Sequence, residues 1–132
     1  MSIKAALSLP YARWVTARVM RRTGDPIGAQ GRVLRMLTGA ARNTAFGRDH
    51  RLDAVDDHVA LTQAVPLRDY EALRPYLDRV ITGERDVLWP GQPIYLCKTS
   101  GTTSGAKYIP ITKQSMPNHI HGARNALLAY IA

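Results

Sequence analysis

One segment constrains the fold of this chain more than any other. Residues 100–105, Ser-Gly-Thr-Thr-Ser-Gly, carry no large apolar side chain, and they stand between two short strand-like runs at 94–99 and 107–111. Two such runs joined by a glycine-containing loop are typical of a β-hairpin. Pro110 lacks an N–H, which confines its strand to a sheet edge or a bulge. A lone hairpin is rarely stable without a third strand or a packed helix layer, so we expect this one to belong to a larger sheet in a complete protein.

Apolar residues upstream of the hairpin recur every three or four positions, which predicts helices. A first helix is expected with Pro10 in its first turn, with Tyr11, Trp14 and Val19 on its apolar stripe, and with Gly24 as its stop. A second is expected from Pro26 to about residue 42, with Asp25 as its N-cap.

The segment 43–53 is polar and is expected to be a break between helices. Either Asp56 or Asp57 can cap a short helix that ends before Pro66. A clearer helix spans 67–82, followed by Gly83 as a left-handed cap.

A last helix follows the hairpin, with Thr112 or Ser115 as its cap. Its apolar stripe comprises Met116, Ile120, Ala123, Leu127 and Tyr130 or Ile131. The expected fold class is α+β: N-terminal helices packed with a small β-hairpin and a C-terminal helix. The pattern stops inside this last helix, so we expect residues 1–132 to be one incomplete domain, helical over 1–83 and strand, loop, strand and helix over 84–132.

Charge is distributed unevenly along the 132 residues, whose formal net charge is +8. Residues 1–51 hold ten Lys or Arg but only Asp25 and Asp49, whereas the remainder holds eight of each sign. A basic third can dock on nucleic acid or anionic membrane, although a solvated helix face is the commoner explanation. No apolar run approaches the ~18 residues of a membrane span, so no membrane span is expected.

The single cysteine, Cys97, cannot form an internal disulfide, and no Cys/His cluster suggests zinc. This usage favours a reducing compartment, with the cytoplasm as the default localisation. Cys97 is expected to be a small buried hydrophobe, and Trp14 and Trp89 are expected to pack in apolar surroundings. His119 and His121 lie two apart on the last helix, so they cannot chelate one metal together.

Phosphate loops need glycines, hydroxyl donors and a cation, and residues 99–107 provide all three. The segment is not a Walker A loop, because that pattern would need Gly in place of Ala106 and Ser or Thr in place of Tyr108. A flexible hairpin turn, with Lys107 as a strand-edge lysine that discourages aggregation, remains the alternative for this segment.

The run Thr-Ser-Gly-Thr-Thr-Ser-Gly-Ala-Lys at 99–107 resembles the phosphate loop of adenylate-forming enzymes. Motifs on both sides resemble the N-terminal region of the Gretchen Hagen (auxin-responsive) family of acyl-acid amido synthetases. These motifs are residues 43–50, 65–71, 73–76, 83–84, 88–91 and 107–112. Their order and spacing make the resemblance more specific than the loop alone.

The resemblance implies an α/β adenylate-forming N-terminal domain, of which this chain would be a part. It implies ATP and Mg²⁺ as cofactors, with a small-molecule carboxylic acid and an amine or amino acid as partners. The residues that it implies for the β- and γ-phosphates are Thr99, Ser100, Gly101, Thr102, Thr103 and Ser104. Lys107 would be catalytic, steadying the departing pyrophosphate, and no metal ligand is assigned.

Two functions therefore stand side by side. In the first, the chain is the N-terminal part of an ATP-dependent amido synthetase and is inactive alone, since no Asp or Glu follows Asp86 and most of the family's site has no counterpart here. In the second, it is a basic helical module that docks on nucleic acid or anionic membrane. Under the first function no nucleic acid partner is expected, and self-association through the last helix is expected.

Overall fold

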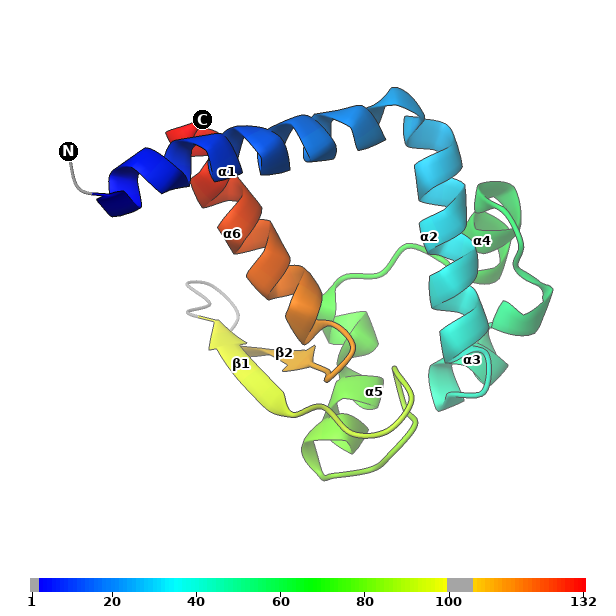
Figure 1. Ribbon diagram of the computed structural model, residues 1–132. Coiled ribbons are helices and arrows are strands. Elements are labelled where there is room, and N and C mark those ends of the chain that lie inside the picture. Colours follow the sequence, from blue (N-terminus) through cyan, green and yellow to red (C-terminus); the bar gives the residue numbers. More distant parts are fainter. Residues whose placement is uncertain (1–2, 100–105) are drawn as a thin grey trace. The chain divides into compact units, whose positions relative to one another are not determined.

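The computed structural model describes residues 3–99 and 106–132 (Figure 1). This part of the chain is α+β, as the sequence predicts, with helices and one two-stranded sheet. In chain order the helices and strands are α1 (Ile3–Arg21), α2 (Pro26–Ala41), α3 (Ala45–Asp49), α4 (His58–Ala64), α5 (Tyr70–Ile81), β1 (Tyr95–Thr99), β2 (Lys107–Ile111) and α6 (Met116–Ile131). Short 3₁₀ turns lie at Arg22–Gly24 (η1) and Leu52–Ala54 (η2). No described helix has the length and apolar character needed to cross a membrane.

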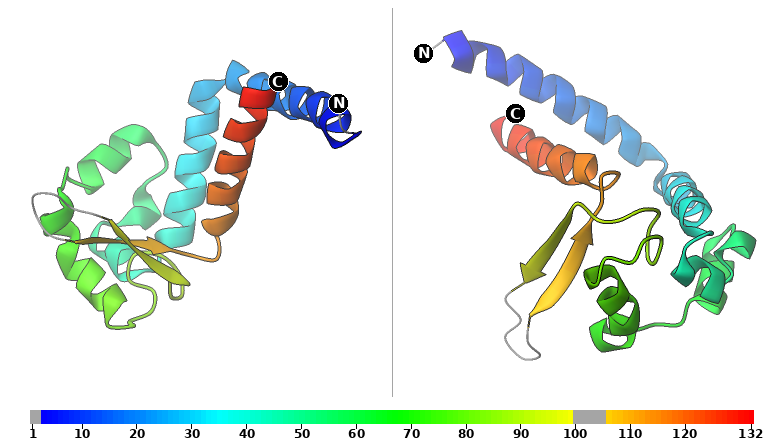
Figure 2. Two further views of the ribbon diagram at one scale, coloured as in Figure 1. Left: turned by 90° about the vertical axis from the view of Figure 1, so that its left-hand side faces the viewer. Right: turned by 90° about the horizontal axis from the view of Figure 1, so that it is seen from below.

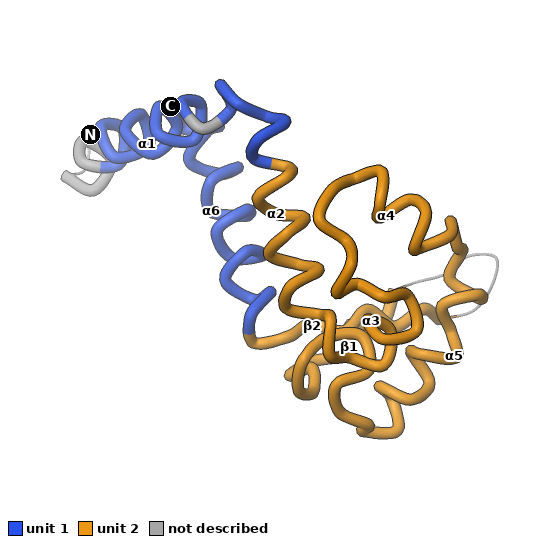
Figure 3. The backbone as a smooth tube through the Cα atoms, turned by 90° about the vertical axis from the view of Figure 1, so that its right-hand side faces the viewer, with its two compact units in different colours: residues 1–29, 114–132 blue, residues 30–113 orange. Residues whose placement is uncertain are grey.

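The chain divides into two compact units (Figure 3). Unit 1 comprises residues 1–29 and 114–132, and unit 2 comprises residues 30–113. Within unit 1, α1 packs along α6 and buries Ala12, Val15 and Leu128 together. The expectation of one domain over 1–132 stays a prediction.

Helix α1 begins earlier than the sequence predicts. It starts at Ile3 and carries Pro10 in its interior, so the prediction that Pro10 lies in the first turn is wrong. A proline removes one N–H donor from the helix ladder, but the Lys, Ala and Leu residues before it are among the strongest helix formers. Favourable propensity on the N-terminal side therefore continues the helix past the proline.

Aspartate caps fix the starts of three helices. Asp25 accepts a hydrogen bond from the Gly28 N–H at the start of α2, which confirms the predicted cap. Of the two candidates for α4, Asp57 is the cap, because its carboxylate accepts from the Ala60 N–H at 2.8 Å.

Helix α5 has a capping group at each end. Asp69 accepts from the Ala72 N–H at 2.8 Å, so the helix begins at Tyr70 and not at residue 67 as expected. At the other end Gly83 has φ +91°, as predicted for a left-handed cap. The N–H groups of Gly83 and Glu84 return to the carbonyls of Val80 and Arg79, which completes a Schellman motif.

The segment 43–53 is not a break, and that prediction is wrong. It forms α3 and η2, because Thr44 donates to the Ala41 carbonyl and accepts from the Gly47 N–H. Gly47 lies so close to the end of α2 that a Cβ there would collide with the Ala41 carbonyl oxygen. Contacts with α2 therefore shape a polar segment that has no helical periodicity of its own.

Two apolar clusters form the core of unit 2. One centres on Ala41, Leu52 and Val55, and Trp89 packs against it as predicted. The other centres on Ala45, Val80 and Val87, of which Val87 is 1% exposed. The first two residues of α3, Ala45 and Phe46, contribute to one cluster each, so this helix joins the two clusters.

Strands β1 and β2 pair antiparallel, which confirms the predicted hairpin. Pro110 lies opposite Leu96 in this two-stranded sheet, where each strand is an edge among the described residues. Cys97 is exposed, so its predicted burial is wrong. Burial of that thiol would need a layer over β1 that the described residues do not supply.

The apolar stripe predicted for α6 differs from the buried one. Leu128 is the buried residue of this helix, whereas Ile120, Leu127 and Tyr130 are exposed. Trp14 is also 55% exposed, so its predicted packing is wrong. Helical spacing identifies the apolar residues of α6, but the contact with α1 determines which of them are buried.

Candidate functional site

The base of the predicted phosphate loop lies at the open end of the hairpin. Thr99 and Lys107 are register partners there, and the Thr99 hydroxyl lies 3.5 Å from the Lys107 carbonyl oxygen. The other predicted loop residues are Ser100, Gly101, Thr102, Thr103 and Ser104, which lie outside the described residues. The structure thus brings together the two ends of the predicted site.

Lys107 projects its ammonium group over the ring of Tyr70. The Nζ atom lies 5.4 Å from the ring centroid, which is a cation–π contact. No carboxylate among the described ion pairs engages Lys107. Its charge therefore remains available to an anion at the loop.

Tyr70 also contacts the backbone beside Lys107. The N–H of Tyr108 donates to the Tyr70 hydroxyl oxygen at 2.8 Å. Figure 2 shows the hairpin beside α5, the helix whose first residue is Tyr70. One side chain of α5 therefore holds two consecutive residues of β2.

Sequence reasoning did not single out Tyr70 as a functional residue. The residue falls on the apolar stripe of α5, where a ring needs no further explanation. The available signal was its place in the motif 65–71, directly after the Asp69 cap. Because the Asp69 cap fixes the backbone at the start of α5, it also fixes the direction in which the Tyr70 side chain leaves the helix, toward the hairpin.

A cluster of polar side chains connects α3 to the segment that leads into α5. The Arg68 guanidinium donates to His50 Nε2 at 2.8 Å, and because guanidinium nitrogens only donate, Nε2 is the acceptor. Nδ1 therefore carries the hydrogen and donates to the Phe46 carbonyl, also at 2.8 Å. His50 is buried and stacks on the Phe46 ring at a centroid distance of 4.0 Å.

Tyr76 on α5 completes this cluster. Its hydroxyl donates to Asp49 at 2.8 Å, and its ring meets the edge of Phe46. Burial raises the pKa of Tyr76 above its ordinary value, the Asp49 hydrogen bond and charge raise it further, and Arg68 acts in the opposite direction. The Arg68–His50 and Tyr76–Asp49 hydrogen bonds join α3 and its C-cap to α5 or to the residues before it, so the cluster is structural and supports the helix that carries Tyr70.

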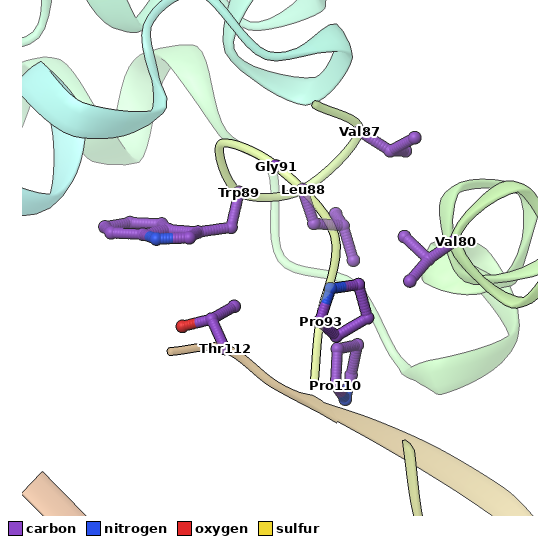
Figure 4. A pocket seen from close by; sticks show the side chains of 8 residues that line it. All are labelled: Val80, Val87, Leu88, Trp89, Gly91, Pro93, Pro110 and Thr112. Carbon is purple, nitrogen blue, oxygen red and sulfur yellow. The ribbon is translucent and has the colours of Figure 1, made fainter. Parts of the chain in front are cut away.

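One small pocket in unit 2, lined mainly by apolar side chains, is not a ligand site. It has a volume of about 20 Å³, which is the space of a single water molecule. Figure 4 shows mainly apolar side chains around it. Val80 is directed toward Pro93, and the Pro110 ring lies beside the Pro93 ring. This cavity is a gap in the packing between α5 and the hairpin.

Metal-binding groups do not gather in the described residues. No set of three or more His, Cys, Asp or Glu lies close enough there to hold a metal ion. The sequence also has no carboxylate after Asp86. Since Mg²⁺ sites generally include carboxylate oxygens, the described residues do not fit a protein-bound Mg²⁺.

Comparison with known proteins agrees with the motifs. The model of the GH3 family N-terminal domain matches residues 16–132. In Oryza sativa subsp. japonica, a protein named as an indole-3-acetic acid-amido synthetase, GH3.10, is 30% identical over 113 residues, which cover 83% of this chain and 22% of that protein. The indole-3-acetic acid-amido synthetase GH3.8 of Oryza sativa subsp. indica is 30% identical over 79 residues, or 59% of this chain and 13% of that protein.

No solved structure matches the chain with comparable significance. The chain spans about a fifth or less of the length of these two rice relatives. The family model, by contrast, covers all of the chain except its first 15 residues, including the hairpin and the Lys107–Tyr70 contact. The chain therefore belongs to the GH3 family and carries its N-terminal domain sequence.

Proposed function

We propose that this chain provides the phosphate-binding hairpin of an ATP-dependent acyl-acid amido synthetase. The observation that carries the proposal is the position of Lys107, opposite Thr99 at the base of a Gly/Ser/Thr loop and engaged with no described carboxylate. The rice relatives support the class of reaction, because their names describe the joining of an acid and an amine as an amide.

The proposed chemistry has two steps. A carboxylate oxygen of the acid attacks the α-phosphorus of ATP, the bond to pyrophosphate breaks, and pyrophosphate leaves with the bonding electron pair. The amine nitrogen then attacks the activated acyl carbon, AMP leaves, and the nitrogen gives up its proton as the amide forms. ATP thus supplies a good leaving group where a carboxylate alone has none.

This chain's own residues would act on the phosphates. The Lys107 ammonium would face negative charge that grows on pyrophosphate as it departs, and the Thr99 hydroxyl and the loop residues Ser100 to Ser104 would donate hydrogen bonds. Donors that are fixed before the reaction stabilise such charge without a reorganisation cost. The described residues offer Mg²⁺ no carboxylate set, and no step here depends on it.

Nucleotide binding by the chain itself is the direct test. ATP titrated into the 132-residue chain and followed by ³¹P NMR should bind with about millimolar affinity, since phosphate contacts alone cover a small part of the ligand. Lys107→Ala should weaken this binding. Lys113→Ala is the matched control, because it removes the same charge beyond the far end of β2. Equal binding by all three proteins would remove Lys107 from the site.

Turnover needs a larger protein, for which a chimera is suitable. This chain would replace the matching segment of rice GH3.8, and carboxylate-dependent exchange of labelled pyrophosphate into ATP would be measured. Ser100→Ala combined with Lys107→Ala should slow the exchange by about 10²–10³-fold, the usual cost of losing a transition-state donor. Exchange at the unmodified rate would show that the loop is only a turn.

A second candidate function is favoured by one observation in unit 1. A hollow of about 570 Å³ between α1 and α6 is lined by exposed aromatic rings together with basic side chains. Trp14 lies between Tyr11, whose ring centroid is 6.3 Å away, and the Arg18 guanidinium. Aromatic rings beside arginines are suited to a single-stranded nucleic acid, with bases on the rings and phosphates on the guanidiniums.

Salt dependence separates this second function from the first. Fluorescence anisotropy of a labelled oligothymidylate should show affinity that falls steeply between about 50 and 200 mM salt if unit 1 binds nucleic acid. Arg18→Gln with Arg124→Gln should then abolish the binding, whereas Lys107→Ala should not affect it. If the oligonucleotide does not bind at 50 mM salt, the second function is excluded.

A further inference from the structure

We propose that Tyr70 is a positioning residue for the phosphate loop: its ring holds the Lys107 ammonium and its hydroxyl fixes the backbone of the next residue. This inference rests on the proposed function, since Lys107 is its object. It adds a residue of a different element, α5, to a site that the sequence places entirely on the hairpin.

Two independent contacts converge on this one side chain. The hydroxyl oxygen accepts from the Tyr108 N–H at 2.8 Å, and the ring lies under the Lys107 Nζ at 5.4 Å. Tyr70, Lys107 and Tyr108 are all half-buried, so the contacts are partly shielded from water. Electrostatic contacts of both kinds are stronger under such shielding.

The two contacts act on different degrees of freedom. The hydrogen bond fixes the backbone of β2 one residue after Lys107, and pairing with β1 fixes the same strand from its other side. The cation–π contact limits the rotamers of a side chain that has four rotatable bonds. A cation restricted in this way loses less freedom when it meets a phosphate, so binding and catalysis gain from preorganisation.

The support of Tyr70 extends into the rest of unit 2. Asp69 caps α5 at the residue before Tyr70, which sets the direction of the first turn. Further along, Tyr76 joins the same helix to Asp49 and to the Phe46 ring. Lys107 and Tyr108 are thereby connected through α5 to the core around α3.

Two substitutions separate the two contacts. Tyr70→Phe keeps the ring and removes the hydroxyl acceptor, whereas Tyr70→Leu removes both. Tyr95→Phe is the matched control, because it deletes a tyrosine hydroxyl from an exposed residue of the same hairpin, at the end away from Lys107. Circular dichroism with urea would verify that each variant folds.

NMR of the 132-residue chain reads each contact directly. Amide exchange at Tyr108 should quicken by about tenfold in Tyr70→Phe, because that N–H loses its acceptor. The ε-protons of Lys107 should show an upfield ring-current shift that persists in Tyr70→Phe and disappears in Tyr70→Leu. Tyr95→Phe should leave both signals as in the wild type. If both Tyr70 variants also leave both signals unchanged, the positioning role is overturned.

Binding of inorganic tripolyphosphate, measured by isothermal titration calorimetry, connects this role to the site. We expect an affinity loss of about threefold for Tyr70→Phe and about tenfold for Tyr70→Leu, with Lys107→Ala as the reference. If Lys107→Ala weakens binding and Tyr70→Leu does not, the inference fails and the proposed function stands. If Lys107→Ala binds as the wild type does, the proposed function fails, and the NMR signals alone then decide whether Tyr70 positions Lys107.

Discussion

Unit 1 and unit 2 both contain α-helices, but they differ in the interactions that stabilise their helices. Among the described residues of unit 1, the buried apolar cluster comprises Ala12, Val15 and Leu128, while large apolar side chains such as Trp14 and Leu127 stay exposed. Unit 2 has two clusters, aspartate caps at α4 and α5, and hydrogen-bonded polar side chains inside. Many weak contacts that all require the same backbone arrangement make a rigid support. Unit 2 has such contacts, and unit 2 also contains the hairpin.

The buried polar residues show the same contrast. In unit 2, Thr44 and His50 are buried and each has two hydrogen-bond contacts. Each unit also has one buried polar atom without a hydrogen-bond partner among the described residues, the Thr16 hydroxyl in unit 1 and Trp89 Nε1 in unit 2. Buried polar groups stabilise one arrangement over others only when they are satisfied, and the described residues with buried, hydrogen-bonded polar side chains belong to unit 2.

The largest effect is expected at Gly47. Gly47→Ala should destabilise unit 2 by about 3 kcal/mol, because the new Cβ meets the Ala41 carbonyl and α3 must shift. Gly39→Ala in α2 is the control: nothing lies within 4 Å of its Cβ, and it should stabilise by about 0.5–1 kcal/mol. Urea denaturation followed by circular dichroism measures both, and equal stabilities would contradict the close approach.

Core truncation in each unit tests the comparison itself. Val87→Ala should cost about 2 kcal/mol, because Val87 is almost wholly buried and its surroundings cannot close the gap. Leu128→Ala in the smaller cluster of unit 1 should cost about 1 kcal/mol, since only Ala12 and Val15 are buried with it among the described residues and less packing is lost. Hydrogen exchange resolved by residue measures the two losses separately, and a larger cost at Leu128 would reverse the comparison.

Exposed apolar residues on α6 predict self-association. Ile120 and Leu127 are 58% and 60% exposed, and monomeric proteins rarely leave such residues grouped on one helix. Sedimentation velocity at micromolar concentration should show oligomers. Leu127→Lys should weaken the association about tenfold, equivalent to about 1.4 kcal/mol. A monomer for the wild-type chain at these concentrations would show that the α6 face needs no cover.

Capping makes a smaller contribution to unit 2. Asp57→Ala should cost about 1 kcal/mol, because the Ala60 N–H loses its acceptor at the start of α4. Asp56→Ala is the control at the neighbouring position and should change the unfolding free energy by less than about 0.5 kcal/mol. Thermal unfolding of the pair measures the difference, and reversed values would assign the cap to Asp56.

The smallest effect is expected from Tyr76 at high pH. Its pKa is raised first by burial and then by Asp49, so the folded state favours the protonated hydroxyl. The stability that this contributes is complete below the ordinary tyrosine pKa of about 10 and is lost as pH rises through the folded value. Urea titrations at pH 9 to 11 should show the decline, which Tyr76→Phe should reduce and Tyr130→Phe, at an exposed residue, should leave unchanged. An identical decline in all three proteins would exclude Tyr76 as its source.

Local signals in the sequence determined much of the fold. Asp25 and Pro26 predicted the start of α2, and Gly83 predicted the end of α5. The composition of the two strand-like runs predicted the hairpin. These signals act through bonds between residues at most a few positions apart. The loop motif and the order of the flanking motifs likewise identified the family before any fold was known.

Tertiary contacts decided the rest. Thr44 and Gly47 fold against the end of α2, so α3 exists where local composition indicates a break. The contact between Tyr70 and β2 joins residues nearly forty positions apart, and no periodicity indicates it. Which apolar face of α6 is buried, and whether Cys97 is covered, likewise depend on which elements pack together. A sequence shows what each residue can do locally, but only the packed chain brings distant residues within reach of one another.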